Sequence, residues 1–343
     1  MLIVLHKNAT EREIKDISRY VEEAGLSPGL VPGARRSAIT VTGNSGAAEL
    51  PAISQMPGVL RVIKVTKPYR LATLEGTSGE HSHWKIGAAS IGKQAPAWFV
   101  AGPCSVDSRE RLLETAHFVK SIGGQALRGG AFKPRTHPYA FQGHGEEGLK
   151  LLAEARDQTG LPIVTEAMDP KQLELVVKYA DVIQLGARNM QNFSLLKQVG
   201  QTRTPVILKR GLAANIDEFL GAAEYILAEG NEQVILCERG IRSFGDHCRF
   251  TLDIAAIAAL KSLTHLPVIA DPSHPAGSRK LVAPLARAAL AAGADGLIIE
   301  VHPDPRHALS DAQQALHFSD LKSLAQDARG VAGVLNRGFG APT

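Results

Sequence analysis

Residues 98–104 read Trp-Phe-Val-Ala-Gly-Pro-Cys, a short apolar run that ends in a turn and a reactive side chain. The pattern recurs through residue 301, giving a set of eight runs: Trp98–Ala101, Ala126–Leu127, Pro162–Val164, Val182–Leu185, Val206–Leu208, Val234–Leu236, Val268–Ala270 and Gly296–Ile299. Stretches with helical periodicity separate the runs. Strand and helix alternating in this way predict an α/β fold, the (β/α)8 TIM barrel, for which about 250 residues is the usual length.

A chemically competent side chain follows nearly every run. These side chains are Cys104, Arg128, Glu166, Arg188, Lys209, Arg239, Asp271 with His274, and Glu300. In barrels of this kind the active site lies at the carboxyl ends of the strands. We therefore expect these side chains to face one common mouth.

The composition bounds the class of protein. The chain has 343 residues and a formal net charge of +4, and it has no basic run or aromatic platform that would indicate nucleic-acid binding. No apolar stretch reaches the ~18 residues of a transmembrane helix. The N-terminus, MLIVLHKNATERE, lacks the basic region and cleavage site of a signal peptide and fits a first strand. Three cysteines without a pairing pattern fit a reducing compartment, so we expect a cytoplasmic enzyme with no membrane association.

Residues 1–66 are expected to form a separate domain. A strand at Leu2–Leu5 precedes a helix that Thr10 caps and that runs through Ala24, with Glu13 completing a capping box. Then follow strands at Leu30–Pro32 and Ala38–Val41, a short helix around Ala47–Ile53 and a strand at Val59–Val65. The order βαββαβ predicts an α+β ferredoxin-like domain.

The rest of the chain divides into a linker and the barrel. Residues 67–96 are rich in Gly and Ser, which predicts a linker that includes a small lid over the closed end of the barrel. Residues 97–330 are expected to hold the barrel, including a final helix at about Asp311–Ala328.

Basic side chains crowd the expected strand ends. They are Arg128, Lys133, Arg135, Arg188, Lys209, Arg210, Arg239 and Arg242. Each could singly be a solvated loop residue, but converging strands bring the set together, and like charges repel unless an anion neutralises them. Arg and Lys recognise phosphate and carboxylate groups. The set therefore predicts a substrate with several phosphates, or with a phosphate and a carboxylate.

A second constellation has the chemistry of a metal site. Cys104, His274, Glu300 and Asp311 come from the ends of the first, seventh and eighth expected strands and the loop beyond. These strands are neighbours in a closed barrel, so the four side chains can meet. A thiolate, an imidazole and two carboxylates suit a divalent first-row metal such as Mn, Fe, Co or Zn. Such a metal can polarise a substrate carbonyl.

Six ordered motifs carry a family resemblance. They are GPCS at Gly102–Ser105, KPRT at Lys133–Thr136, GARN at Gly186–Asn189, LKRG at Leu208–Gly211, CERG at Cys237–Gly240 and DPSH at Asp271–His274. With them the chain resembles 3-deoxy-D-arabino-heptulosonate 7-phosphate (DAHP) synthase along essentially its whole length, including the ferredoxin-like domain of the type I beta subgroup. The resemblance implies condensation of phosphoenolpyruvate with erythrose 4-phosphate to DAHP and phosphate. That reaction is the first step of the shikimate pathway of aromatic amino-acid biosynthesis.

The resemblance also implies roles for individual residues. A divalent metal, with Mn2+ favoured over Fe2+, Co2+ or Zn2+, is held by Cys104, His274, Glu300 and Asp311. Phosphoenolpyruvate is held by Arg128, Lys133, Arg188, Lys209 and Arg239. Arg135 and Thr136 hold the phosphate of the aldose, and His137 departs from the small residue that follows this Thr in relatives.

Two catalytic roles stay open at the sequence level. Lys133 is placed to protonate the aldehyde oxygen, with His274 or a metal-bound water as alternatives. Glu166 either steers the water that attacks the enol phosphate or neutralises a neighbouring cation.

Two other functions compete with this one. 3-Deoxy-D-manno-octulosonate 8-phosphate synthase shares the barrel and uses arabinose 5-phosphate, but its loop differs from Lys133–Thr136. A silent barrel that only senses metabolites would not need four metal ligands.

Regulation is expected to reside in residues 1–66. We expect this domain to bind tyrosine or phenylalanine as a feedback inhibitor, the alternative being a role in assembly alone. We also expect a homo-oligomer, a tetramer, because a ferredoxin-like sheet commonly pairs with a second copy.

Overall fold

The computed structural model describes residues 1–31, 37–42, 50, 52–63, 69–133, 137 and 139–341. The chain divides into two compact units, Met1–Arg70 and Leu71–Thr343. Each unit has its own apolar core. Among the described residues, no helix combines the length and apolar character needed to cross a bilayer.

Unit 1 has the expected ferredoxin-like fold. Its elements are β1 (Leu2–Leu5), α1 (Glu11–Glu23), β2 (Ser27–Val31), β3 (Ala38–Thr42), the 3-10 turn η1 (Ile53–Gln55) and β4 (Val59–Ile63). The antiparallel sheet has the order β2-β3-β1-β4. Ile3 and Leu5 alternate with half-buried neighbours and pack with Ile17 and Val21 of α1. The helix expected at Ala47–Ile53 falls largely outside the described residues.

The start of α1 follows from the sequence. The Thr10 hydroxyl accepts from the Glu13 amide at 3.3 Å, and the Glu13 carboxylate accepts from the Thr10 amide at 2.7 Å. This reciprocal arrangement is the expected capping box, and it satisfies two backbone donors.

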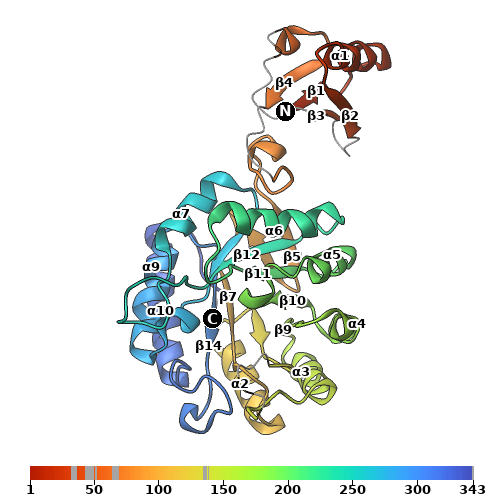
Figure 1. Ribbon diagram of the computed structural model, residues 1–343. Coiled ribbons are helices and arrows are strands. Elements are labelled where there is room, and N and C mark those ends of the chain that lie inside the picture. The colour runs from red at the N-terminus through yellow and green to blue at the C-terminus, as the bar shows by residue number, and fades with distance from the viewer. Residues whose placement is uncertain are drawn as a thin grey trace. The chain divides into compact units, whose positions relative to one another are not determined.

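Unit 2 is a closed barrel of parallel strands with helices around it (Figure 1). The strands are β7 (Trp98–Gly102), β8 (Ala126–Arg128), β9 (Ile163–Glu166), β10 (Val182–Leu185), β11 (Val206–Lys209), β12 (Val234–Glu238), β13 (Val268–Ala270) and β14 (Gly296–Glu300). They pair in chain order, and β14 closes the barrel on β7. The expected TIM barrel is therefore confirmed, and all eight apolar runs lie in strands except for Pro162, which precedes β9.

The helices of unit 2 follow the strands as the periodicity predicts. They are α2 (Arg109–Ser121), α3 (Glu146–Thr159), α4 (Pro170–Tyr179), α5 (Phe193–Gln201), α6 (Ile216–Ala228), α7 (Ile254–Leu263), α8 (Ser273–Ala276), α9 (Arg279–Ala291) and α10 (Phe318–Val334), with 3-10 turns η2 (Glu75–Thr77), η3 (Ala187–Asn189) and η4 (Pro305–His307). The last long helix begins at Phe318, later than expected, so Asp311 lies in the loop between β14 and α10.

The segment before the barrel has more regular structure than the linker with a small lid that was expected at residues 67–96. Residues from Leu71 onward belong to unit 2, where β5 (His83–Ile86) and β6 (Ala89–Gly92) form a two-stranded hairpin. Ile86 and Ile91 of this hairpin pack in one cluster with Trp98 and other residues of the barrel interior. Because a strand pair with an apolar face is ordered by what it covers, the hairpin is part of the barrel core.

The beginning of unit 2 is fixed by hydrogen bonds from the helical layer. The Glu224 carboxylate of α6 accepts from the amides of Leu71 and Ala72, each at 2.9 Å. His265 bonds the Leu71 carbonyl through Nε2 and the Ser82 hydroxyl through Nδ1, each at 2.7 Å. A carbonyl only accepts, so Nε2 carries the hydrogen.

We predict that His265 lowers the free energy of unfolding in mild acid relative to neutral pH. Burial lowers its pKa, partly opposed by the hydrogen bond to Leu71 and the charges of Glu232 and Glu224. The unfolded chain therefore takes up this proton first as the pH falls below about 6.5. Stability is lost from that pH down toward the lower folded pKa. Urea unfolding at pH 7.5 and 5.5 should show a smaller loss for His265→Gln than for the wild type.

The matched control is His117→Gln, at an exposed position on α2. It should lose as much stability as the wild type over the same pH interval. Equal losses for the wild type and His265→Gln would contradict the prediction.

Candidate active site

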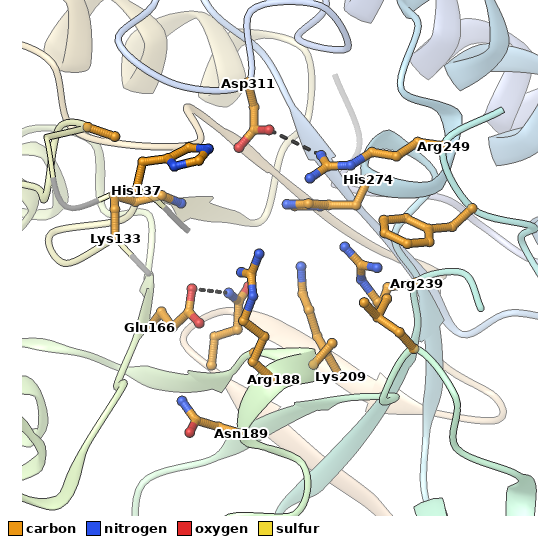
Figure 2. Close-up of a pocket in the computed structure, with 16 residues that line it drawn as sticks. Lys133, His137, Glu166, Arg188, Asn189, Lys209, Arg239, Arg249, His274 and Asp311 are labelled. Carbon is orange, nitrogen blue, oxygen red and sulfur yellow. Dashed lines mark hydrogen bonds and ion pairs between the residues drawn. The ribbon is translucent and has the colours of Figure 1, made fainter. Parts of the chain in front are cut away.

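A cavity of about 260 Å3 opens where the barrel strands end. Its polar lining includes Lys133, His137, Glu166, Gln184, Arg188, Asn189, Lys209, Arg239, Arg249, His274 and Asp311. In Figure 2 the side chains of Arg188, Lys209 and Arg239 point into the same space as His274 and Asp311. Cations outnumber carboxylates in this lining, so the cavity is suited to an anion.

The four expected metal ligands come together at one corner of this mouth. One ligand atom each from Cys104, His274, Glu300 and Asp311 lies within 4.8 Å of the others. The Cys104 thiol donates to Asp311 Oδ2 at 2.8 Å, and His274 Nε2 lies 3.4 Å from Glu300 Oε1. A sulfur, an imidazole nitrogen and two carboxylates this close fit a divalent first-row metal.

His274 is oriented by a buried carboxylate beneath it. Asp271, fully buried, bonds His274 Nδ1 through Oδ2 at 2.6 Å, and its Oδ1 accepts from the amides of Ser273 and His274. This bond places the hydrogen on Nδ1 and leaves the Nε2 lone pair free on the side of Glu300, as metal-ligating histidines require. Burial opposes ionisation of Asp271, but the neighbouring His274 and Lys209 hold its pKa well below the ordinary value.

Lys133 lies between the metal corner and the cavity. Its ammonium donates to the Cys104 carbonyl at 3.0 Å and to Cys104 Sγ at 3.1 Å. Burial opposes its charge, yet Cys104 and Glu166 raise the pKa of Lys133 above the ordinary value. Burial and the charge of Glu300 raise the pKa of the Cys104 thiol to about 12. The Lys133 side chain is therefore a charged ammonium at neutral pH.

Asp311 is held in a rare backbone conformation. Its φ is 50°, in the left-handed region that a side chain with a Cβ seldom adopts. Arg249 of the β12–α7 loop donates to its Oδ1 at 3.3 Å while Oδ2 takes the Cys104 thiol. Strain of this kind gathers at functional sites because surrounding contacts over-determine it.

A buried cluster behind the metal corner ties its two loops together. Asp107 accepts from His302 Nε2 and the Ser105 hydroxyl, both at 3.0 Å, and from the Leu309 amide at 3.1 Å. Ser105 also bonds Ser310 at 2.7 Å. Cys104 and Asp311, each next to a member of this cluster, are thereby held at a fixed separation.

Two buried guanidinium groups at the barrel mouth have unsatisfied donors, one on Arg239 in the cavity lining and one on Arg128 beside Glu300. NH1 of Arg239 and Nε of Arg128 are buried and have no hydrogen-bond partner among the described residues. Arg239 also stacks on Phe250, 4.8 Å from the ring centroid. The NH1 group of Arg128 donates a hydrogen bond to Glu300 at 3.0 Å. Buried donors of this kind call for an anionic ligand.

Glu166 occupies space that a glycine leaves open. Gln184, which pairs with Glu166 on the neighbouring strand β10, donates to Glu166 Oε2 at 3.4 Å. A Cβ on Gly186 would stand 2.2 Å from Glu166 Oε1. The carboxylate therefore depends on the bare backbone of Gly186 for its position.

Several sequence predictions need qualification at this point. The prediction that Arg210 faces the mouth is wrong, because its guanidinium is buried against Glu238, Asp253 and the Ala214 carbonyl. Arg242 is exposed and does not line the cavity. Arg135 and Thr136 lie outside the described residues.

Sequence reasoning missed other residues of the site. These are Gln184, Gly186, Asn189, Arg249 and Phe250. Of these, Gly186 and Asn189 lie inside a motif already singled out, whereas Arg249 and Phe250 lie on the β12–α7 loop with no periodic signal.

The fold and this mouth define a barrel with a candidate metal centre beside an anion-binding cavity. The chain belongs to the DAHP synthetase I family, whose model matches residues 73–334, and the DAHP synthase ferredoxin-like domain matches residues 1–67. A Thermotoga maritima protein named phospho-2-dehydro-3-deoxyheptonate aldolase is 45% identical over 337 residues, which cover 98% of both chains.

Solved structures and a second group of relatives extend this result. The crystal structure of Thermotoga maritima phospho-2-dehydro-3-deoxyheptonate aldolase (DAHP synthase) matches with a TM-score of 0.78 at 44% identity, covering 98% of each chain. A truncated form of 3-deoxy-D-arabino-heptulosonate 7-phosphate synthase from the same organism matches 79% of this chain, with a TM-score of 0.73 and 46% identity. A Stenotrophomonas maltophilia 2-dehydro-3-deoxyphosphooctonate aldolase is 33% identical over 260 residues, 71% of this chain and 93% of its own.

We predict that Gly186→Ala impairs turnover without unfolding the barrel. The φ of Gly186 is −68°, which alanine adopts freely, so the only conflict is the added Cβ against the Glu166 carboxylate. Displacing that flexible side chain by about 1 Å should lower kcat on the order of 100-fold. Steady-state phosphate release, with circular dichroism to confirm folding, measures the effect.

Gly221→Ala provides the control, because a Cβ at this α6 position meets nothing within 4 Å. It should keep wild-type turnover. Unchanged kcat in Gly186→Ala would show that the position of Glu166 does not matter for the reaction.

Proposed function

We propose that this chain condenses phosphoenolpyruvate with erythrose 4-phosphate, releasing phosphate and forming DAHP. The observation that carries the proposal is the meeting of a four-ligand metal corner with a cation-lined cavity at one barrel mouth. Membership of the DAHP synthetase I family and the relative named phospho-2-dehydro-3-deoxyheptonate aldolase support the choice of reaction.

Phosphoenolpyruvate is held by the cations of the cavity. Lys209, Arg188 and Arg239 supply charge to its phosphate and carboxylate, and the free donors of Arg239 and Arg128 are satisfied on binding. This anchoring presents C3 of the enol phosphate to the aldehyde, so orientation lowers the barrier. Arg135 and Thr136 hold the aldose phosphate.

Cys104, His274, Glu300 and Asp311 hold a divalent metal, for which Mn2+ is our first choice before Fe2+, Co2+ or Zn2+. When bound, this metal supplies Lewis-acid polarisation of the aldehyde carbonyl. C3 bonds to the aldehyde carbon, and Lys133 gives a proton to the aldehyde oxygen as it becomes a hydroxyl.

The second half of the reaction involves Glu166. Positive charge develops at C2 of the former enol, and Glu166 steers the water that adds there. The proton that this water loses replaces the one that Lys133 gave to the aldehyde oxygen. Gln184 donates a hydrogen bond to this carboxylate, and Gly186, which has no Cβ, leaves room for it. The tetrahedral intermediate then loses phosphate with cleavage of its C–O bond, leaving the ketone of the product.

Arabinose 5-phosphate is the competing candidate for the aldose, because a relative named 2-dehydro-3-deoxyphosphooctonate aldolase is 33% identical over 71% of this chain. Two features favour erythrose 4-phosphate. The KPRT sequence of Lys133–Thr136 resembles that of DAHP synthases, and residues 1–67 match the DAHP synthase ferredoxin-like domain.

Replacing Cys104 tests the metal and the reaction together. Cys104→Ala removes the thiolate, so bound metal after dialysis and phosphate release should both fall to background. The substitution Cys237→Ala, at a buried cysteine of the barrel core, is the control and should keep both. Full metal content with a normal rate in Cys104→Ala would exclude this metal assignment.

The aldose is tested by comparing kcat/KM for erythrose 4-phosphate and arabinose 5-phosphate in the metal-loaded protein. We expect erythrose 4-phosphate to be the better substrate. Arg135→Ala should raise KM for the aldose far more than KM for phosphoenolpyruvate, and Lys209→Ala should do the reverse or stop turnover. A higher kcat/KM with arabinose 5-phosphate would identify an octulosonate synthase, and no metal-dependent release with either aldose would favour a sensor.

We further propose that unit 1 is regulatory and binds tyrosine or phenylalanine, in a homo-oligomer that we take to be a tetramer. None of the described residues that line the cavity belongs to unit 1. The chemistry therefore leaves this unit free for another task, although fold alone does not fix that task.

A chain that begins at Leu71 should retain turnover and lose inhibition by the two amino acids. The truncated Thermotoga relative supports the expectation that the barrel folds alone. Phosphate release is measured with each amino acid up to millimolar concentration, a range suited to weak effectors. If the full-length protein ignores both, unit 1 serves assembly, and size-exclusion chromatography of the two forms should then differ in oligomeric state.

A further inference from the structure

One carboxylate oxygen joins the two halves of the mouth. Asp271 Oδ2 accepts from Lys209 Nζ at 2.5 Å and from His274 Nδ1 at 2.6 Å. Lys209 lines the anion-binding side, whereas His274 belongs to the metal corner. Asp271 itself lies behind both side chains, fully buried, and is not among the residues that line the cavity.

We propose that Asp271 is a positioning residue that couples metal binding to phosphoenolpyruvate binding, so that each ligand tightens the other. This inference rests on the proposed function, because it takes Lys209 as a substrate contact and His274 as a metal ligand. It assigns Asp271 a role beyond holding the histidine ring in its tautomer.

The coupling follows from competition for one oxygen. In the unliganded site, the Lys209 ammonium neutralises much of the charge on Asp271 Oδ2. An anion that engages Lys209 shares that ammonium, so more of the carboxylate charge acts on the Nδ1–H bond of His274. A stronger bond at Nδ1 makes Nε2 a more basic metal ligand.

The reverse direction has the same physical basis. A metal on Nε2 makes the Nδ1 hydrogen more acidic and draws the Asp271 charge toward the imidazole. Lys209 is then held less tightly by Asp271 and is released to the substrate anion. Thermodynamic linkage requires the two effects to be equal in size.

The surroundings of Asp271 make this exchange specific. Its Oδ1 is fixed by the amides of Ser273 and His274, each at 3.1 Å, so the carboxylate cannot rotate to serve the two cations separately. Full burial keeps water from screening either interaction.

The experiment measures Co2+ affinity in the full-length protein, with free Co2+ set by a competing chelator, at zero and saturating phosphoenolpyruvate. Thiolate-to-cobalt absorption reports occupancy at Cys104 without any turnover. We expect phosphoenolpyruvate to tighten Co2+ by about fivefold or more, and Co2+ to tighten phosphoenolpyruvate by the same factor.

In Asp271→Asn the amide has no charge to exchange, so the coupling factor should fall to about one, and Co2+ affinity should drop about 10–100-fold. Asp295→Asn is the control, because Asp295 is another buried carboxylate that bonds a lysine, Lys261, but at the start of β14. It should keep the wild-type factor. If Asp271→Asn does not fold, Asp271→Glu keeps the charge but cannot place one oxygen at both partners, and the same loss of coupling is expected.

The outcomes separate this inference from the proposed function. A wild-type factor of one, or a wild-type factor retained in the Asp271 variant, overturns the coupling role even when turnover with erythrose 4-phosphate is normal. A purely structural Asp271 would lower both affinities and leave the factor unchanged. Coupling that is present in a protein without that turnover would instead reject the proposed reaction alone.

Discussion

The mouth of the barrel depends on a balance between buried cations and the carboxylates placed among them. Closing eight parallel strands brings Arg128, Lys209 and Arg239 to one small region, where like charges repel strongly. Two carboxylates offset this repulsion: Glu300 lies 3.0 Å from Arg128, and Asp271 lies 2.5 Å from Lys209. The same two carboxylates face His274, so the groups that make the cation cluster tolerable also build the metal corner.

Much of the fold could be predicted because burial dictates the sequence pattern. Parallel strands covered on both faces must be apolar throughout, which made the eight runs visible, and the capping box at Thr10 and Glu13 is a local signal. A small lid was expected in this segment, but the two strands of the β5–β6 hairpin were not, because their order comes from packing. Ile86 and Ile91 lie among turn residues, and only the barrel interior that they cover explains them.

Residues of the candidate site were predicted correctly where a strand end fixes their position. The prediction failed where it ignored that side chains alternate between the two faces of a strand. Ile207 and Lys209 point to the barrel interior, so Leu208 and Arg210 point to the helices, and Arg210 duly pairs with Glu238 of the next strand. A period of two would have excluded Arg210 from the cation set in advance. Arg249 has no such signal, because its place beside Asp311 results from the path of a long loop. Gly186 matters because it leaves room for the Glu166 carboxylate. The sequence could not show this, because it does not give the position of that side chain.

The distribution of similarity along the chain bears on how the two units divide the work. Relatives named phosphooctonate aldolases match 71% of the chain, a share that unit 2 alone could supply, and the truncated Thermotoga structure also lacks part of the full length. The metal corner and the cavity reside wholly in unit 2 as far as the chain is described. The Thermotoga relative that covers 98% of the chain retains the ferredoxin-like unit as well. A unit retained beside a barrel that already contains the candidate chemistry supports the proposal that unit 1 serves control or assembly.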